Sequence, residues 1–255
     1  MTQAQIEACT SGISPEETDA LFLAQHLSAY AFARRLVAGK RVLEIGFGYG
    51  YGSNYLAEVA ADVTGIDMAH GNIPRAQATY PRPNLRFLHM EGTRLRFSDG
   101  SFDVVGSFQV IEHIPEAQLG DHLSEVRRVL RPEGVYCLST LNLAHNIKPG
   151  RPYQKMHMHE KEFTGPELRA LLERFFPQVD LYGLYLTPKH RLYLRLKRWG
   201  LNRLGPPRLN PIARFYTDAS VADFVARPGA SRDALDLIAV CWNSSHVTEG
   251  PRACP

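Results

Sequence analysis

Cysteine is scarce in this chain, and no two cysteines lie close together. The 255 residues contain four cysteines, which are far apart in the sequence: Cys9, Cys137, Cys241 and Cys254. Zinc sites and redox dithiols commonly use two cysteines separated by two residues, so the sequence predicts neither, and we expect no metal site. A reduced, cytoplasmic setting is the simplest expectation, because disulfides belong mainly to oxidising compartments.

Long apolar runs are also missing. A membrane-spanning helix needs about 20 apolar residues, and charge or glycine interrupts every apolar run well before that length. The opening MTQAQIEACTSG has neither a basic start nor an apolar stretch behind it, so we expect no secretory signal. The composition, 44% hydrophobic and 22% charged, is typical of a globular protein. We therefore expect one domain over residues 1–255, without a membrane span.

Net charge is small, but basic residues are concentrated in one segment. The whole chain carries +3, whereas residues 189–214 contain eight Lys or Arg and no acid. Leu192, Leu196 and Trp199 follow at i, i+4 and i+7, which predicts an amphipathic basic helix. Three roles are open for this helix. It covers the core and turns its charged face to solvent, it binds a phosphate-bearing acceptor, or it makes peripheral contact with an anionic membrane. We expect no nucleic acid partner, because the basic charge is confined to one short segment.

Apolar strands alternate with amphipathic helices along most of the chain. Residues 15–37 predict a helix with Ser14 as its cap. Further helices are predicted at 54–59, 72–80, 119–130 and 164–175, and strands at 41–46, 61–67, 85–90, 101–110, 135–142, 179–186 and 235–242. The strands are nearly continuous apolar runs, as in parallel sheets that are buried on both faces. The sequence therefore predicts an α/β fold with two irregular insertions, at 143–163 and 187–232.

Glycine alternates with other residues directly after the first predicted strand, in VLEIGFGYGYG. Such a turn lets a ligand approach bare backbone amides. Asp67 ends the next predicted strand, where dinucleotide-binding folds place an acid that binds a ribose diol, although their glycine spacing is G-x-G-x-x-G rather than G-x-G-x-G. The pattern favours a nucleotide-like cofactor, with a purely structural turn as the alternative. Gly52 is expected to let the following helix pack close to the sheet.

Several motifs in residues 40–142 resemble, in order, those of the S-adenosylmethionine-dependent methyltransferases. Glu44-x-Gly46-x-Gly48-x-Gly50 is similar to the first motif of that family, and GID, MEGTRLRFSDGSFDVV, QVIEHI and VRRVLRPEGV are similar to later ones. The resemblance implies a Rossmann-like, seven-stranded, mostly parallel sheet with helices on both faces and a C-terminal antiparallel strand. It also implies an N-terminal helical cap (1–38), a cofactor-binding core (39–142), and acceptor or lid segments at the two insertions.

The same resemblance implies a cofactor, S-adenosyl-L-methionine, with S-adenosyl-L-homocysteine as product. The acid and glycines of the first motif hold its amino-acid end, Asp67 accepts from both ribose hydroxyls, and Glu91 accepts from the adenine amino group. Without the ordered motifs, Asp67 and Glu91 would be read as ordinary solvated strand ends. The expected cofactor-binding residues are Tyr30, Glu44, Gly46, Gly48, Gly50, Asp67, Met68, Glu91, Gly92 and Gln109.

Histidines are the candidates for catalysis. Transfer of a methyl group to a hydroxyl requires a base for the hydroxyl proton, and His is suited to that role near neutral pH. His113 follows the fourth strand, and His157 and His159 lie in the first insertion. We expect His113 or His159 to be the base. A structural role for His113 is the alternative, because related methyltransferases have the same Glu-His pair whatever their substrate.

A narrower resemblance concerns the acceptor. STLN, HMHEKEFTGPELRALLERFF and HLSAYAFARRLVAGKRVLE are similar to segments of a methyltransferase group linked to glycan and cell-surface polysaccharide biosynthesis. In that group a tyrosine aligned with Tyr30 lies over the cofactor, and a histidine aligns with His159. The resemblance implies O-methylation of a sugar hydroxyl. The alternatives are O- or N-methylation of another small metabolite, and a non-catalytic subunit that binds the cofactor and supports a partner.

Overall fold

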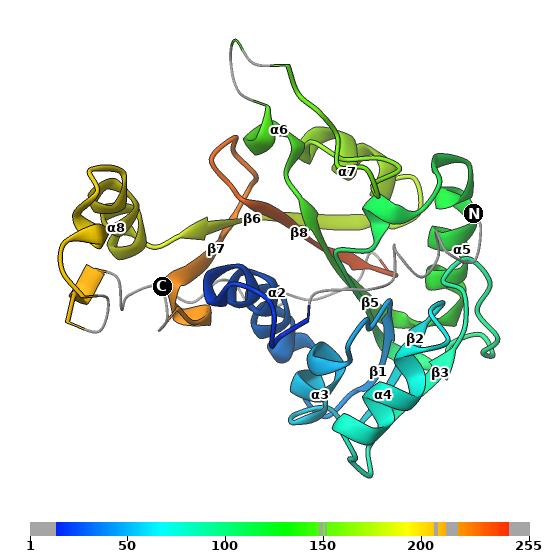
Figure 1. The fold of residues 1–255 in the computed structure, drawn as a ribbon. Coiled ribbons are helices and arrows are strands. Elements are labelled where there is room, and N and C mark those ends of the chain that lie inside the picture. The colour runs from blue at the N-terminus through cyan, green and yellow to red at the C-terminus, as the bar shows by residue number, and fades with distance from the viewer. Residues whose placement is uncertain (1–13, 148–149, 151, 207–208, 213–218, 245–255) are drawn as a thin grey trace.

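One continuous sheet of eight strands runs through the molecule (Figure 1). The computed structural model describes residues 14–147, 150, 152–206, 209–212 and 219–244. The strand order is β3-β2-β1-β4-β5-β8-β6-β7. The fold is therefore α/β with a mostly parallel sheet, as the sequence predicts.

The parallel part of the sheet contains the predicted cofactor-binding segments. Its strands are β1 (Arg41–Ile45), β2 (Asp62–Asp67), β3 (Leu85–His89), β4 (Phe102–Phe108) and β5 (Leu130–Leu141). From β1 the chain builds outward to β2 and β3, and then returns to place β4 on the other side of β1. Ligands of open α/β sheets bind where the strand order reverses in this way, at the carboxyl ends of the strands.

The antiparallel part contains one more strand than the sequence predicts. Strand β8 (Asp236–Trp242) pairs antiparallel with β5 and with β6 (Gln178–Leu186). Strand β7 (Phe224–Pro228) then adds an antiparallel edge to β6. The prediction of seven strands missed β7, which lies in the insertion 187–232. Its five residues, FVARP, include a charged residue and a proline, and they lack the apolar run that marked the other strands.

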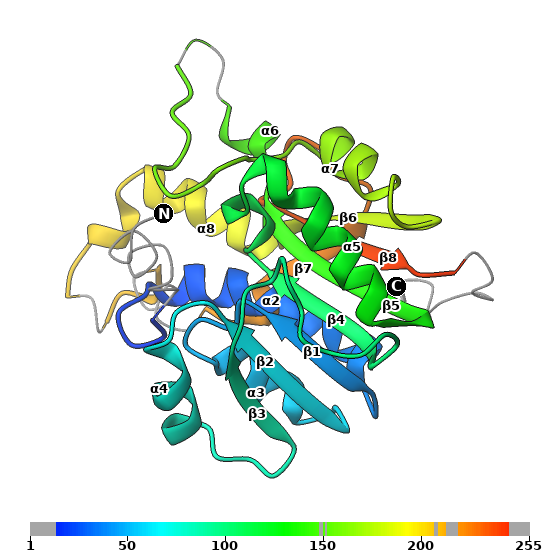
Figure 2. The same ribbon diagram turned by 90° about the vertical axis from the view of Figure 1, so that its right-hand side faces the viewer.

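Helices cover both faces of the sheet, as predicted (Figures 1 and 2). One face is covered by α2 (Ala20–Val37), α3 (Tyr51–Ala57) and α4 (Asn72–Thr79), and the other by α5 (Leu119–Val129) and α7 (Gly165–Leu172). The short elements are α6 (Leu143–Asn146), η1 (Ile111–His113), η2 (Glu116–Gln118), η3 (Leu201–Arg203) and η4 (Val221–Asp223). Among the helices of the described ranges, none combines the length and apolar character that crossing a bilayer requires.

Helix α2 begins five residues later than predicted. Residues 15–18 form a turn, and Asp19 caps the helix by accepting hydrogen bonds from the Leu21 and Phe22 amides at 3.0 and 3.4 Å. The expected cap, Ser14, instead accepts at its carbonyl from the Thr18 amide at 3.1 Å. An aspartate side chain satisfies the free amides of a first helical turn well, so Asp19 sets the start. At the start of α7, Thr164 and Glu167 form a capping box, in which each side chain accepts from the other residue's backbone amide.

The basic segment forms a helix, α8 (Pro188–Arg198), as its spacing predicts. Its apolar stripe, however, does not face the core. Leu192 is 56% exposed and Trp199, which ends the helix, is 70% exposed, whereas His190 and Tyr193 are buried. The α8 helix lies beyond the ends of β6 and β7, at the side of the molecule away from α5 (Figure 1). The insertion 187–232 is thus more regular than expected, and it presents apolar and basic side chains together.

Candidate active site

The predicted site residues follow four neighbouring parallel strands. The glycine turn follows β1, Asp67 ends β2, Glu91 follows β3 and Gln109 follows β4. Ile45 pairs with Ile66 on one side and with Ser107 on the other, so the carboxyl ends of these strands coincide. The structure therefore brings these predicted segments to one edge of the sheet.

The glycine turn passes through backbone conformations that favour glycine. Gly46, Gly48 and Gly50 have φ values of 76°, 55° and 84°. A β-carbon on Gly46 would lie 2.6 Å from the Val110 side chain, and one on Gly50 would lie 2.9 Å from the Ala76 β-carbon. Larger residues would thus clash as well as strain the backbone. The turn, which is the loop after β1, thus packs against Val110 in the loop after β4.

Asp67 links the glycine turn to β2. Its side chain is buried, with Oδ2 accepting from the Gly48 amide and Oδ1 from the Ala69 amide, both at 2.8 Å. Burial raises the pKa of Asp67, although these hydrogen bonds partly oppose the shift. A carboxylate has about four lone-pair positions, and the side chain of Asn72 is a further hydrogen-bond partner besides the two amides. The carboxylate therefore keeps room for a further donor, and its contact to the ribose hydroxyls stays a prediction.

Glu44 and Tyr30 lie beneath the glycine turn rather than in the open. The Tyr30 hydroxyl donates to Glu44 Oε1 at 2.7 Å, and the Ser53 hydroxyl donates to Oε2. Glu44 is fully buried, and burial raises its pKa to about 7, with the charge of Asp67 adding to the rise. Ser53, which lies in α3 outside every motif, was not predicted as a site residue. Direct contact of Glu44 or Tyr30 with the cofactor stays a prediction.

Gly52 is required by Tyr30. A β-carbon at this position would lie 2.2 Å from two ring atoms of Tyr30. The ring also packs on Phe108, with the centroids 4.2 Å apart. The close approach therefore joins α3 to α2, whereas the sequence predicted an approach to the sheet.

The loops after β2 and β3 provide the exposed part of the edge. Met68 is 37% exposed and Glu91 is also exposed. His89 contacts the Met68 carbonyl through Nε2 at 3.1 Å. Gly92 is tightly packed, because a β-carbon there would lie 2.7 Å from Ile45. Of the two predicted adenine-binding residues, Glu91 is therefore accessible, and the adjacent backbone at Gly92 is fixed by its packing on Ile45.

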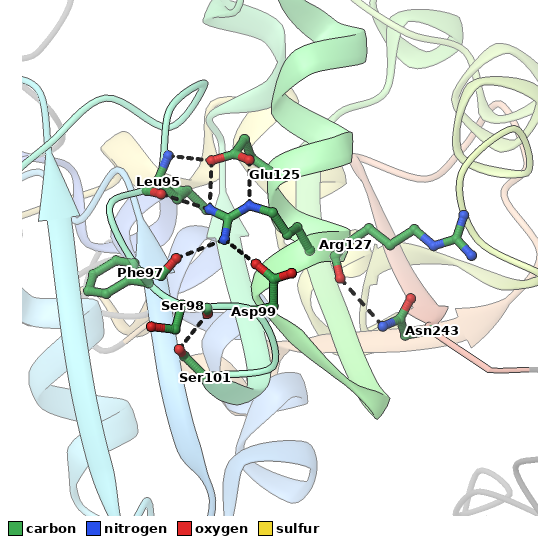
Figure 3. Close-up of polar contacts among 9 residues, drawn as sticks. Leu95, Phe97, Ser98, Asp99, Ser101, Glu125, Arg127 and Asn243 are labelled. Atoms are coloured by element: carbon green, nitrogen blue, oxygen red, sulfur yellow. Dashed lines mark hydrogen bonds and ion pairs between the residues drawn. The ribbon is translucent and has the colours of Figure 1, made fainter.

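Arg128, from the VRRVL motif, contacts the loop between β3 and β4, of which Leu95, Phe97 and Asp99 are labelled in Figure 3. Its guanidinium donates at 2.7 to 2.9 Å to the side chains of Glu125 and Asp99 and to the carbonyls of Leu95 and Phe97. Glu125 in turn accepts from the Leu95 amide at 2.8 Å. These contacts connect α5 with the loop between β3 and β4, so the motif arginine has a structural role here.

Gln109 adopts an unusual backbone conformation after β4. Its φ is 57°, a value shared by no other non-glycine residue in the described ranges. Its amide donates to the Ser139 carbonyl at 2.9 Å, which fixes the turn. Such conformations cost about 1–3 kcal/mol and cluster at functional sites. The conformation supports a functional role for this predicted residue.

The structure brings the two candidate histidines together. The rings of His113 in η1 and His159 lie with their centroids 4.9 Å apart at an angle of 81°. Nδ1 of His113 lies 3.0 Å from the Met158 carbonyl, and Nδ1 of His159 lies 2.7 Å from Glu162 Oε1. Burial lowers the pKa of both, to about 4 for His159, so both rings are neutral near pH 7. His157, by contrast, is exposed and lies outside this group.

Glu112 completes the group and was missed as a site residue, although the quoted motif QVIEHI contains it. It is 1% exposed, and neither carboxyl oxygen has a hydrogen-bond partner among the residues that the structure describes. Burial raises its pKa to about 8, and the nearby Thr140 hydroxyl opposes this only partly, without hydrogen-bond geometry. The available signal was the acid directly before His113 in QVIEHI.

The strand order, the glycine turn and the acid at the end of β2 together define a Rossmann-like fold for a nucleoside-containing cofactor. Residues 43–138 match the methyltransferase domain family. A probable S-adenosylmethionine-dependent methyltransferase of Mycolicibacterium smegmatis is 40% identical over 232 residues, which cover 85% of this chain and 86% of that protein. The chain therefore belongs to the S-adenosylmethionine-dependent methyltransferases, and its cofactor is S-adenosyl-L-methionine.

Other relatives differ in their acceptors. A ubiquinone biosynthesis O-methyltransferase of Azorhizobium caulinodans is 36% identical over 65% of this chain and 70% of that protein. A phthiotriol/phenolphthiotriol dimycocerosates methyltransferase of Mycobacterium ulcerans is 34% identical over 54% of this chain and 48% of that protein. None of these three names states a glycan acceptor.

Solved structures share the fold at low sequence identity. A possible histamine N-methyltransferase of Thermotoga maritima has a TM-score of 0.61 at 15% identity, covering 87% of this chain and 92% of that one. A Burkholderia thailandensis 1,6-didemethyltoxoflavin-N1-methyltransferase, solved with S-adenosylhomocysteine, has a TM-score of 0.54 at 18% identity, covering 87% and 79%. Both likenesses concern the fold alone.

Proposed function

We propose that this methyltransferase acts on a hydroxyl group of a small or glycan-like acceptor, with a sugar hydroxyl as the first candidate. The observation that carries the proposal is the pair of neutral histidines, His113 and His159, beside the glycine-turn edge of the sheet. A hydroxyl must lose its proton during methylation, and a neutral imidazole is a suitable acceptor.

The residues at this edge fit the cofactor. S-adenosyl-L-methionine supplies a methyl group on a positively charged sulfonium, and its amino-acid part carries an ammonium. Buried carboxyl groups of Glu44 and Asp67 favour a cation nearby. We assign the glycine turn and Gln109 to the amino-acid part, Asp67 and Met68 to the ribose, and Glu91 and Gly92 to adenine. Glu44 and Tyr30 support the turn from beneath.

The reaction requires positioning and one proton transfer. S-adenosyl-L-methionine would supply its methyl group to the acceptor oxygen, with the electron pair of the carbon–sulfur bond returning to sulfur. The hydroxyl proton passes to Nε2 of His113 or His159, since Nδ1 of each is occupied. A pKa of about 4 makes His159 a weak base, so in-line alignment must supply most of the rate enhancement.

A lipid-borne hydroxyl or phenol is the second candidate acceptor. The relatives that are named for ubiquinone biosynthesis and for dimycocerosate lipids favour it. So does the surface formed by the exposed side chains of α8 and the residues after it, here called the α8 surface: Arg191, Leu192, Arg195, Arg198, Trp199, Arg203, Leu204 and Leu209. Exposed apolar side chains among basic ones suit contact with anionic lipid, where such an acceptor would reside.

An acceptor panel tests the proposal. Methyl-labelled cofactor is incubated with the protein and with nucleotide-linked sugars, glycolipids, prenylated phenols and amines, and labelled product is identified by mass spectrometry. Label on a sugar oxygen supports the first candidate, and label on a lipid or phenol oxygen supports the second. Exclusive N-methylation contradicts the proposal. Tight cofactor binding without transfer to any acceptor favours the non-catalytic partner subunit instead.

A further inference from the structure

The group formed by Glu112, His113 and His159 has the donors of a divalent metal site. Each residue offers one ligand atom, and these three atoms all lie within 4.8 Å of one another. Two imidazole nitrogens and one carboxylate oxygen form a ligand set that proteins use for zinc and for other divalent transition metals. Four-coordinate zinc with bonds of about 2.1 Å needs ligand atoms about 3.4 Å apart, so a bound ion would draw these groups slightly together.

The hydrogen bonds around the histidines orient them as metal ligands. The Met158 carbonyl can only accept, so Nδ1 of His113 carries the proton and Nε2 keeps its lone pair. His159 makes the equivalent contact through Nδ1 to the carboxyl of Glu162. Metal-binding histidines typically donate their second nitrogen to a carbonyl or a carboxylate in this manner. Both Nε2 atoms are therefore available to an ion.

Glu112 supplies the second, independent indication. Its carboxyl group is 1% exposed, and within the described residues neither oxygen has a hydrogen-bond partner. Burying a carboxyl group without partners is costly. The adjacent backbone is in contrast well fixed, because the Glu112 carbonyl accepts from the Glu160 and Lys161 amides at 2.7 and 3.1 Å. These two bonds hold the segment of His159 against η1, so the three ligands are kept together by the fold.

We propose that Glu112, His113 and His159 bind a divalent transition-metal ion, which holds the acceptor hydroxyl through an open coordination position. The inference rests on the proposed function for its role, since a bound metal lowers the pKa of a coordinated hydroxyl and stabilises the negative charge on its oxygen. With both Nε2 atoms bound to the ion, the hydroxyl proton leaves to water rather than to a histidine. In this arrangement His113 and His159 bind the metal ion, and neither acts as the base that accepts the hydroxyl proton.

Calorimetric titration of Zn²⁺ into the chelator-treated, dialysed protein tests the site. We expect one ion to bind with micromolar or tighter affinity. Glu112→Gln and His159→Gln should each weaken this binding by at least about tenfold, and Glu162→Gln by about tenfold through the orientation of His159. Co²⁺ at the same site should give visible absorption that these variants lose. Thermal unfolding of each variant checks that it folds, and Glu112→Gln is the safest, because it replaces the carboxyl group with an amide of nearly the same shape.

A second pair of histidines provides the matched control. His70 and His89 lie with ring centroids 5.3 Å apart on the surface, and they offer a competing place for Zn²⁺. His70→Gln should leave the tight site unchanged. If Zn²⁺ does not bind to the wild-type protein, or if Glu112→Gln binds Zn²⁺ as tightly as the wild-type protein does, the inference is overturned.

Titration of S-adenosylhomocysteine without added metal separates this inference from the proposed function. If the cofactor product binds and O-methylation proceeds in chelator, while Zn²⁺ does not bind, the metal site is wrong and the proposed function stands. If Zn²⁺ binds at Glu112 but no hydroxyl acceptor is methylated in any metal condition, the proposed function fails and the site is retained.

Discussion

Three carboxyl side chains lie buried near the carboxyl ends of the central strands. They belong to Glu44 in β1, Asp67 at the end of β2 and Glu112 after β4. Burial raises the pKa of each, to about 7 for Glu44 and about 8 for Glu112. Burial disfavours the ionised form of these carboxyl groups, and a nearby cation favours that form again. At the residue scale, the site is thus prepared for positively charged ligands.

Cofactor binding should release a proton near pH 7. Glu44 is partly protonated there, because its pKa is about 7, and a bound cation lowers that pKa. Since the ionised carboxylate binds a cation more tightly, the affinity for S-adenosylmethionine should fall as pH decreases through 7. Calorimetry in two buffers of different ionisation enthalpy measures the proton number. Glu44→Gln should show no release, and proton uptake by the wild-type protein would contradict the assignment.

Gly52→Ala should destabilise the fold. The added β-carbon would overlap the Tyr30 ring, which lies 2.2 Å from its position, and overpacking typically costs about 1–3 kcal/mol. Gly71→Ala is the matched control, because nothing lies within 4 Å of the position of its β-carbon and its φ is not positive. Urea unfolding gives both free energies. Equal stability of the two variants would show that Tyr30 moves aside without cost.

At the scale of elements, side-chain contacts determine which backbone segments stay in place. Arg128 of α5 donates hydrogen bonds to the loop between β3 and β4. Glu91 and Gly92 lie in the same loop. The contacts are charge-assisted and involve both backbone and side chains. Hydrogen bonds to charged groups contribute more than neutral ones.

Arg128→Gln should destabilise the protein by about 2 kcal/mol, because it removes charge-assisted hydrogen bonds to the loop. We also expect weaker cofactor binding, since the loop presents Glu91. Arg127→Gln is the control on the same helix, since its side chain is exposed and its carbonyl, which the substitution keeps, accepts from the Asn243 side chain at 3.4 Å. Urea unfolding and S-adenosylhomocysteine titration measure the two effects. Loss of stability without any change in affinity would confine Arg128 to a purely structural role.

Elements with a strong periodic pattern were predictable from the sequence. The parallel strands and the glycine turn were placed correctly because buried parallel strands are apolar throughout and glycine marks a tight turn. Strand β7 was missed because an edge strand buries only part of its residues. The start of α2 was missed because Ser14 and Asp19 are both good caps, and their local patterns do not decide between them. Glu112 was missed because its significance depends on His159, 47 positions later.

At the scale of the whole molecule, the α8 surface lies at one end of the sheet and combines cations with exposed apolar groups. Trp199 is 70% exposed and Leu209 is 79% exposed, which is unusual for such large apolar side chains among arginines. A protein that meets its acceptor at a lipid surface would gain from both kinds of side chain.

The protein should sediment with anionic vesicles and much less with neutral ones. The double substitution Arg195→Glu with Arg198→Glu should weaken partitioning by at least about tenfold, because each basic residue contributes about 1 kcal/mol near an anionic surface. Trp199→Ser should weaken it without altering the charge. The double substitution Lys40→Glu with Arg127→Glu changes net charge equally outside the α8 surface, and it should have a smaller effect. Equal losses in both double variants would indicate a nonspecific response to net charge.

The position of β8 has a consequence for how the polypeptide acquires this structure. Strand β8 is the last strand in the described ranges, yet it lies between β5 and β6 and pairs with both. The two portions of the sheet that precede it in the chain therefore remain unjoined until residues near 242 have been synthesised. During translation, β5 therefore presents an unpaired edge from its own synthesis until β8 follows about 100 residues later, and an exposed strand edge favours aggregation.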